Sequence, residues 1–296
     1  MPAFAAEFGM PVRVDLVSSA PRKTEKFYRE LLNWNYTNAD PAYGTQAAAD
    51  MQGRRVATLQ GMPVSVLLDA NSADSTDFVD NQWRVNFHVD NVAAVCEKAA
   101  SLGTEVLQEP IELIDGSLMA VIADPAGALV GLLQQPGEQT FFAAGEPGAP
   151  VWFELITANH DDFQKAMDFY HELFGWGMTV HTASEEGSYA VATEGGAPFA
   201  GIVGGRGTGT TVVEGDASFV GWLAYLGVEN IDTAVNNAEQ YGGKVLVPAQ
   251  MTEFGPLATI QDPCGATTIL CEVPLPPEED QGEVDIFDNL DISQFQ

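Results

Sequence analysis

The chain has 296 residues, with 42 acidic and 12 basic side chains and a formal net charge of −30. Hydrophobic residues make up 46% of it, which indicates a globular chain of about two domains and not a disordered acidic one. The scarcity of lysine and arginine argues against partners such as nucleic acid or an anionic membrane surface, because both are bound by clustered basic groups.

The first 136 residues show one pattern of elements twice. An alternating strand is predicted at 12–18, and a helix follows at 21–32 with a proline suited to its first turn. Short alternating runs predict strands at 45–50, 55–60 and 64–69. The order then restarts with a strand at 83–89, a helix at 92–102, and strands near 105–109, 117–123 and 128–134. Each half is thus a βαβββ unit, and the short links predict mixed or largely antiparallel sheets.

The whole pattern is then repeated later in the chain. The segment FYRELLNW at 27–34 recurs as FYHELFGW at 169–176, VDN at 89–91 as VEN at 228–230, and DPAG at 124–127 as DPCG at 262–265. These ordered repeats indicate a duplication. They predict a first module at 11–136, a linker rich in proline and glycine at 137–149, a second module at 150–274, and a tail at 275–296 with seven acids and no base.

The paired βαβββ units, the FYxELLxW helix, the V-[DE]-N step and the DPxG turn resemble the vicinal oxygen chelate superfamily. This superfamily contains glyoxalase I, bleomycin-resistance proteins and extradiol dioxygenases, and the arrangement here is most similar to its tandem, glyoxalase-like bacterial members. The resemblance covers both modules. It implies an α+β fold in which the paired units of each module form a cup-shaped mixed sheet.

In the metal-using members, the resemblance implies His and Glu ligands on the first strand, on a middle strand, on the strand before V-[DE]-N, and after DPxG. Three of these positions can be carried across to each module: Asp15, Arg84 and Gly131 in the first, and Glu154, Leu223 and Ile269 in the second. A catalytic metal needs about three protein ligands, and arginine has no lone pair to offer. We therefore expect no catalytic metal and no other cofactor.

The cup of the first module is expected to be polar. Strand alternation places Arg84, Asn86 and His88 on one face, and the alignment turns this face and Asp15 into the cup. In one interpretation, Arg84 binds a carboxylate, phosphate or enolate oxygen, and His88 acts as a donor or proton shuttle. In the other, Arg84 and Asp15 form a buried structural ion pair. The sequence leaves both interpretations open.

The cup of the second module is expected to be apolar and aromatic. Leu223 and Tyr225 share its face with Trp152 and Glu154. Glu154 is a candidate general base or ligand anchor, and the alternative is a carboxylate held by backbone donors. The two cups have diverged, so we do not expect them to bind the same ligand.

The leading hypothesis is a protein that binds a small organic molecule, anionic where it meets Arg84, in one or both cups without a catalytic metal. It would either sequester this molecule, in the manner of bleomycin-resistance proteins, or act as a metal-independent lyase or isomerase. The catalytic residues are not identifiable from the sequence. Two alternatives are a metal-dependent lyase or dioxygenase that uses Asp15, Glu154 and His88, and a scaffold that acts through the acidic tail.

The sequence is also typical of a cytoplasmic protein. No apolar run approaches the ~20 residues that span a bilayer, and the N-terminus does not resemble a signal peptide. Three scattered cysteines do not make a disulfide framework. A duplicated chain can pair its own modules, so either a monomer or a homodimer is expected.

Overall fold

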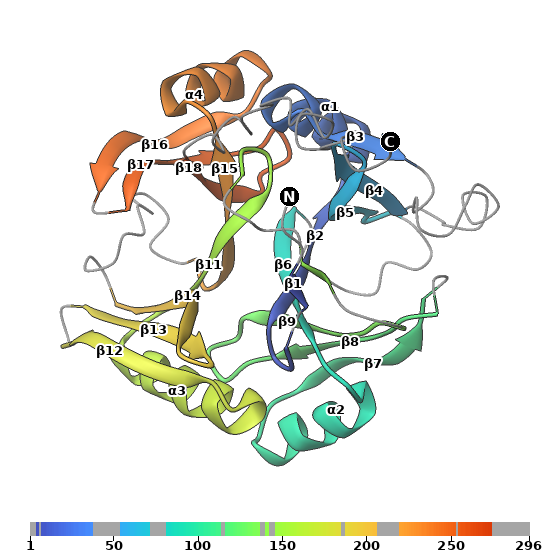
Figure 1. Cartoon of the computed structure of the whole chain (residues 1–296), viewed down its shortest axis with the longest axis vertical. Helices are drawn as coiled ribbons and strands as arrows, with labels where there is room; N and C mark the ends of the chain where they lie inside the picture. The colour runs from blue at the N-terminus through green and yellow to red at the C-terminus, as the bar shows by residue number, and fades with distance from the viewer. Residues whose placement is uncertain are drawn as a thin grey trace, which may run out of the picture.

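The computed structural model describes residues 4–5, 7–37, 54–71, 81–113, 116–136, 140–141, 146–184, 187–205, 219–252 and 254–273. Within these ranges the chain forms four successive βαβββ units, two in each module, as predicted (Figure 1). The run at 45–50 and the acidic tail lie outside the described residues. The predicted linker carries the strand β10 (Thr140–Phe141), which pairs antiparallel with β1 (Phe4–Ala5).

The elements of module 1 agree with the predicted ranges to within a few residues, except for β3, which was not predicted. Its first unit comprises β2 (Pro11–Ser18), α1 (Pro21–Leu32), β3 (Asn35–Thr37), β4 (Arg54–Leu59) and β5 (Met62–Asp69). Its second unit comprises β6 (Gln82–His88), α2 (Val92–Ser101), β7 (Val106–Glu112), β8 (Leu118–Ala123) and β9 (Leu129–Gln134).

Module 2 repeats this order. Its first unit comprises β11 (Pro150–Thr157), α3 (His160–Phe174), β12 (Gly177–Ala183), β13 (Ser188–Glu194) and β14 (Ala197–Gly204). Its second unit comprises β15 (Gly221–Val228), α4 (Ile231–Gln240), β16 (Lys244–Thr252), β17 (Gly255–Gln261) and β18 (Thr267–Glu272).

Each module forms one eight-stranded mixed sheet. The strand orders are β3-β4-β5-β2-β6-β9-β8-β7 in module 1 and β12-β13-β14-β11-β15-β18-β17-β16 in module 2. The two units of module 1 join through the antiparallel pair β2 and β6, while β2 with β5 and β6 with β9 are parallel. Both units of a sheet therefore come from the same module, and the modules do not exchange halves.

Local sequence explains where the helices begin and end. In α1, Phe27, Tyr28 and Leu31 are buried at the three- and four-residue spacing of one helix face. The first turn of α3 is capped by Asn159, whose side chain accepts a hydrogen bond from the backbone N–H of Asp162. This helix ends at Gly175, where φ is 81°, a left-handed conformation that glycine adopts without strain.

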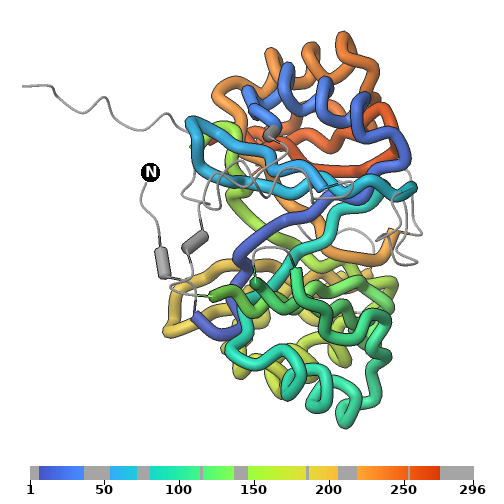
Figure 2. Tube along the Cα trace, turned by 90° about the vertical axis from the view of Figure 1, so that its right-hand side faces the viewer, coloured from blue at the N-terminus to red at the C-terminus, as the bar shows by residue number. Residues whose placement is uncertain are grey.

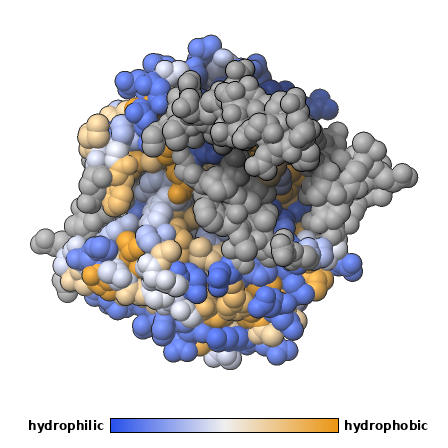
Figure 3. Space-filling model, in the orientation of Figure 1, coloured by the Kyte–Doolittle hydropathy of each residue, from blue (hydrophilic) through white to orange (hydrophobic). Residues whose placement is uncertain are grey.

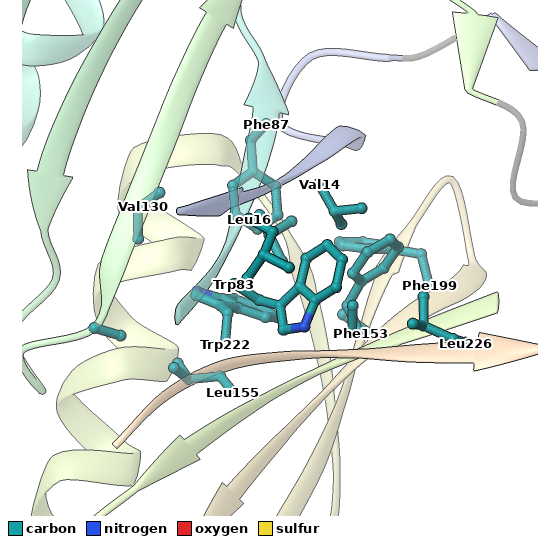
Figure 4. Packing of buried hydrophobic residues seen from close by; sticks show 14 of the residues in the cluster. Val14, Leu16, Trp83, Phe87, Val130, Phe153, Leu155, Phe199, Trp222 and Leu226 are labelled. Atoms are coloured by element: carbon teal, nitrogen blue, oxygen red, sulfur yellow. The ribbon is translucent and has the colours of Figure 1, made fainter. Parts of the chain in front are cut away.

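The two sheets share one hydrophobic core. Each sheet curves in Figure 1, with its helices and the core on the outer side of the curve. Val14 and Trp83 from module 1 point toward Phe153 and Trp222 from module 2 (Figure 4). The helices also pair between modules, because α1 lies beside α4 at one end of the molecule and α2 beside α3 at the other (Figure 2). The opposite, concave faces of the sheets are consequently turned away from each other.

Residues of the repeated motifs hold the modules together. The indole N–H of Trp34 donates to the carbonyl of Gly148 over 2.6 Å, and that of Trp176 donates to the carbonyl of Gly9 over 3.0 Å. Each tryptophan of FYxELLxW thus binds the backbone just before the first strand of the other module. The motif supports the module interface as well as its own helix.

A second contact at the interface is made in only one of its two symmetry-related copies. Tyr170 donates to Oδ2 of Asp124 in the DPxG turn of module 1 over 2.9 Å, and it accepts from the indole of Trp222 over 2.9 Å. In the other copy, Tyr28 interacts with the indole of Trp83, but Oδ2 of Asp262 has no hydrogen-bond partner among the described residues.

The surface differs between the helices and the strand tips. Hydrophilic side chains cover the end of the molecule that carries α1 and α4 in Figure 3, whereas apolar surface lies over the β16–β17 tip. There Met251 is 78% exposed and Phe254 is 54% exposed. No helix among the described residues is long and apolar enough to cross a membrane.

Candidate functional site

The concave face of module 1 is centred on the antiparallel pair β2 and β6. Asp15 lies opposite Arg84 in this pair, and Arg13 lies opposite Asn86. The intervening residues, such as Val14 and Val85, point into the shared core. Alternation along the two strands therefore places these polar side chains on the face that points away from the core, as predicted.

Asp15 is the anchor of this face, because two arginines bind its carboxylate. Arg13 donates from Nε to Oδ1 over 2.7 Å and from Nη2 to Oδ2 over 3.0 Å. Arg84 donates from Nη2 to Oδ2 over 2.8 Å. Asp15 is fully buried and Arg84 is 2% exposed, so this is a buried ionic cluster and not a surface pair.

The charges on this face act strongly on one another. Burial alone would raise the pKa of Asp15, but the charges of Arg13 and Arg84 outweigh it and hold the pKa far below the ordinary range of a carboxyl. The charge of Arg54 adds to this effect. Burial lowers the pKa of Arg84, and Asp15 opposes that change.

Arg54 reaches this face from β4. Val56 of β4 lies opposite Val66 of β5, which in turn lies opposite Asp15. Arg54 is two residues before Val56 and hence on the same face of the sheet. Three of the seven arginines of the chain, at positions 13, 54 and 84, thus act on one buried carboxylate.

Asn86 and His88 continue the polar face along β6. Asn86 is fully buried, and its Nδ2 donates to the backbone carbonyl of Arg13 over 3.2 Å. Its amide lies over Gly131 of β9, where a Cβ atom would come within 2.0 Å of Oδ1. His88 places Nε2 3.4 Å from Oδ1 of Asp90. The structure therefore brings the four predicted residues of module 1 onto one face.

An apolar cluster adjoins the arginines on the same face. Met119 links the two groups, because its sulfur lies 3.6 Å from Nη2 of Arg13 and 3.8 Å from Nη2 of Arg84. We call these side chains the module 1 apolar cluster: Val12, Leu113, Met119, Val121, Leu129 and Leu133. A cationic region and an apolar region are thus continuous on the concave face of module 1.

The concave face of module 2 carries a carboxylate without such an arginine cluster. Glu154 is fully buried, and the hydroxyl of Tyr225 donates to its Oε2 over 2.7 Å. Glu154 lies opposite Leu223, and Trp152 lies opposite Tyr225. Apolar side chains surround this group: Val151, Trp152, Ile156, Phe219, Leu223, Leu257, Ile269 and Cys271. The predicted aromatic and apolar character of this face is present.

Comparison with known proteins identifies the fold in both modules. Residues 12–133 match the model of a glyoxalase-like domain, and residues 152–270 match that of the Glyoxalase/Bleomycin resistance protein/Dioxygenase superfamily. The chain belongs to this superfamily. It is a tandem member, with one module in each half.

Relatives and solved structures cover nearly the whole chain. A putative glyoxylase, CFP32 of Mycobacterium tuberculosis, is 28% identical over 87% of this chain and 92% of its own. The anthracycline biosynthesis protein DnrV of Streptomyces peucetius is 28% identical over 87% of this chain and 91% of its own. The fold is shared with a Mn(II)-bound glyoxalase from Novosphingobium aromaticivorans, with a TM-score of 0.54 and 12% identity over 92% of this chain and 83% of that one.

The divalent metal of the superfamily does not fit the residues on these faces. Among the described residues, no group of three or more His, Cys, Asp or Glu side chains is placed to hold an ion. The carboxylate of Asp15 is bound by Arg13 and Arg84, and a metal there would have to displace guanidinium groups. In module 2, the position opposite Glu154 is Leu223, which has no donor atom.

The alternative set of Asp15, Glu154 and His88 does not form one site, so that hypothesis needs correction. Asp15 and His88 belong to the sheet of module 1, and Glu154 to that of module 2. The neighbours of Asp15 and Glu154 along their strands pack into the shared core, so the two carboxylates point in opposite directions. Matching each strand to the superfamily pattern could not reveal that the concave faces of the two sheets point away from each other.

The prediction missed several residues on these faces. Arg54 was not a candidate, because the strand was expected to begin at 55, although the paired arginines at 54 and 55 were a visible signal. Met119 gave no signal, since a methionine in an apolar strand is ordinary. In module 2, Oη of Tyr189 and Oε1 of Glu154 both lie over Gly201, within 3.0 and 3.1 Å of where a Cβ atom would stand.

Proposed function

We propose that the concave face of module 1 binds the acidic group of a small organic ligand without a catalytic metal. The observation that carries this proposal is that Arg13 and Arg84 both bind the single carboxylate of Asp15, with Arg54 on the same face of the sheet. The chain as a whole carries a net charge of −30, so this cationic cluster stands out from its surroundings.

Guanidinium groups suit this role because they present several donors in a fixed plane to a carboxylate, phosphate or enolate oxygen. Asp15 keeps Arg13 and Arg84 on the concave face by direct hydrogen bonds. Burial strengthens the attraction for an incoming anion, because the screening by water is reduced. Asp15 is on this account a positioning residue, and the arginines contact the ligand.

The module 1 apolar cluster supports an organic ligand over a bare inorganic ion. Met119 contacts both arginines, so a carbon skeleton attached to a bound acid group would lie against this cluster. One curated relative is named as an anthracycline biosynthesis protein, which places that relative in the synthesis of a small organic molecule. Binding of this kind serves either sequestration or a metal-independent lyase or isomerase reaction.

The proposal is tested by calorimetric titration of the full chain with a panel of aromatic and aliphatic carboxylates. Saturable binding with a Kd below ~1 mM is expected for the aromatic acids, and Arg54→Gln should weaken it by about tenfold. Arg55→Gln is the matched control, because Arg55 lies on the opposite face of the same strand and pairs with Glu25 of α1. Equal effects of the two variants would contradict the proposal.

Whether acid binding needs a metal is tested separately, by elemental analysis of protein purified without chelator. We expect acid binding to be the same before and after dialysis against a chelator. A stoichiometric divalent metal, together with loss of acid binding once the metal is removed, would favour the metal-dependent alternative instead.

A further inference from the structure

We propose that the acidic tail at 275–296 binds back onto the exposed face of α1 in the same chain, where its carboxylates neutralise a row of basic side chains. This contact is independent of the acid-binding face of module 1, because α1 lies on the outer, convex side of that sheet (Figure 1). It gives the tail, with its seven acids and no base, a partner within the protein itself.

Basic residues are concentrated on α1. This helix of 12 residues contains Arg22, Lys23, Lys26 and Arg29, which are four of the 12 lysines and arginines in the whole chain. All four residues are exposed. Such a concentration is unexpected in a chain with a net charge of −30, so this surface calls for an anionic partner.

The spacing of these residues makes them a continuous stripe. Arg22, Lys26 and Arg29 are four and three residues apart, so they are neighbours on a single face of the helix. We call these three, together with the adjacent Lys23, the α1 basic stripe. The opposite face of the helix packs Phe27 into the shared core, which holds the stripe toward solvent.

Most of the stripe has no anion to neutralise it among the described residues. The acids of α1 are Glu25 and Glu30. Arg29 binds Glu25, which also binds Arg55 of β4. The other three members of the stripe make no ion pair with any residue that the structure describes, although α4 lies directly beside α1 (Figure 2).

The tail starts close enough to reach the stripe. The turn before β18 lies against the start of α1, because Sγ of Cys264 is 3.4 Å from Oγ1 of Thr24. β18 ends at Glu272, so the tail starts within ~30 Å of the helix at ~3.3 Å per residue. Residues 274–296 span about 75 Å when extended and about 25–30 Å as a random coil, so their relaxed length matches this gap.

Attachment and charge favour the tail over other anions. A linker whose relaxed length matches the gap holds its end near the site at an effective concentration in the millimolar range. Nucleic acid or a second copy of the chain would instead have to approach a body that is itself strongly acidic. The tail is therefore the anion that meets the stripe at the highest local concentration.

Carbodiimide crosslinking of the full chain tests the contact, because it joins a carboxylate directly to a lysine. The stripe contains Lys23 and Lys26, and the matched control is Lys165 of α3, which is 59% exposed at the opposite end of the molecule. Relative to the acetylation of each lysine, we expect the tail to join the stripe at least about tenfold more often than Lys165. Salt at 1 M should reduce these crosslinks at least about fivefold.

Arg22→Glu reverses one charge of the stripe and leaves both of its lysines in place. It should reduce the tail crosslinks about threefold, whereas Lys165→Glu, with the same change in net charge, should leave them unchanged. In a mixture of isotope-labelled and unlabelled protein, each crosslinked product should carry a single label.

Three outcomes would overturn the proposal: no crosslink between tail and stripe, equal crosslinking to Lys165, or products that carry both labels, which would assign the stripe to the tail of a second copy. Titration with the aromatic carboxylates should give the same affinity for Arg22→Glu as for the wild type. A chain that binds no acid but crosslinks as expected would therefore contradict the proposed function alone.

Discussion

The two modules keep a buried carboxylate at the same position of their first strands, yet they stabilise it by different chemistry. Asp15 of module 1 is bound by the guanidinium groups of Arg13 and Arg84. Glu154 of module 2 accepts a hydrogen bond from the hydroxyl of Tyr225, on a face lined by apolar and aromatic side chains. One fold thus supports an ionic site and a largely apolar one.

The difference arises at a few paired positions. The residue opposite the carboxylate is Arg84 in one sheet and Leu223 in the other. Two residues further along the same strand, Asn86 faces Gly131, whereas Tyr225 faces Ile269. The parts of the motifs that hold the modules together are retained in both copies. Duplication has therefore kept the scaffold and changed the ligand chemistry.

The largest effect is expected where a buried charge loses its partner. Asp15→Asn leaves the guanidinium of Arg84 buried without its carboxylate, and we expect a loss of ~3–5 kcal/mol in the free energy of unfolding. Glu154→Gln should cost ~1–2 kcal/mol, because Tyr225 can still donate to an amide oxygen. Urea denaturation of both variants measures the difference.

The double variant Asp15→Asn, Arg84→Met tests whether the loss comes from the unpaired charge of Arg84. It removes the buried charge together with its partner, so it should be more stable than Asp15→Asn alone. Equal losses for Asp15→Asn and Glu154→Gln would mean that the two faces are energetically alike, and the comparison between the modules would fail.

The second prediction concerns pH and the buried carboxyl of Asp124. Burial raises its pKa to about 6, against about 3.9 in an unfolded chain. The folded state therefore binds the proton more tightly, so this group stabilises the protein fully below pH ~4, and the contribution is lost as the pH rises through 6. We expect Asp124→Asn to flatten the pH dependence of stability between pH 5 and 7 by ~1–1.5 kcal/mol.

Asp15 does not contribute to the pH dependence of stability between pH 5 and 7. Its folded pKa is depressed, so its contribution is present above pH ~4 and is lost only in stronger acid. Burial also raises the pKa of Asp262, the counterpart of Asp124. In Asp124→Asn, stability should therefore still fall slightly as the pH rises. Stability that rises with pH between 5 and 7 in the wild type would contradict the assignment to Asp124.

Much of the fold could be predicted from the sequence, because each strand buries one face. Alternation in 83–89 placed Arg84 and Asn86 on the concave side, and the structure confirms this placement. The strand β3 was not predicted, since three residues are too short to show a period. Local pattern was sufficient wherever the element was long and one face met the core.

The site was less predictable, because its residues meet only through the register of several strands. Arg54 of β4 lies on the same face as Asp15 of β2, with β5 between them, and its charge lowers the pKa of Asp15. No spacing along the chain reveals such neighbours. The buried contact between Tyr170 and Asp124 likewise depends on how two modules pack, which a repeat does not specify.

The third prediction compares the two copies of the tyrosine at the module interface. Tyr170→Phe removes the donor to Asp124 and the acceptor of Trp222, and we expect a loss of ~2 kcal/mol. Tyr28→Phe should cost less than ~1 kcal/mol, because it removes only the interaction with Trp83 and no bond to Asp262, whose Oδ2 has no partner among the described residues. Thermal and urea unfolding of both variants gives the two values, and equal losses would show that the copies are equivalent.

The smallest effect is expected at two glycines on the concave faces, Gly131 beside Asn86 and Gly201 beside Glu154. In Gly131→Ala, the new Cβ atom would lie 2.0 Å from Oδ1 of Asn86, so that amide must turn and lose its bond to Arg13. We expect a cost of ~1 kcal/mol in the free energy of unfolding. In Gly201→Ala, the nearest atoms are Oη of Tyr189 at 3.0 Å and Oε1 of Glu154 at 3.1 Å, which need to shift by only a few tenths of an ångström.

Gly201→Ala should therefore cost less than ~0.5 kcal/mol and leave acid binding unchanged. Denaturation curves give the two stabilities, and titration with the aromatic acids gives the binding. Equal costs for the two variants would mean that the amide of Asn86 turns without losing a useful bond. If Gly201→Ala weakened acid binding, the acid would bind in module 2, and the division of chemistry between the two faces would have to be reversed.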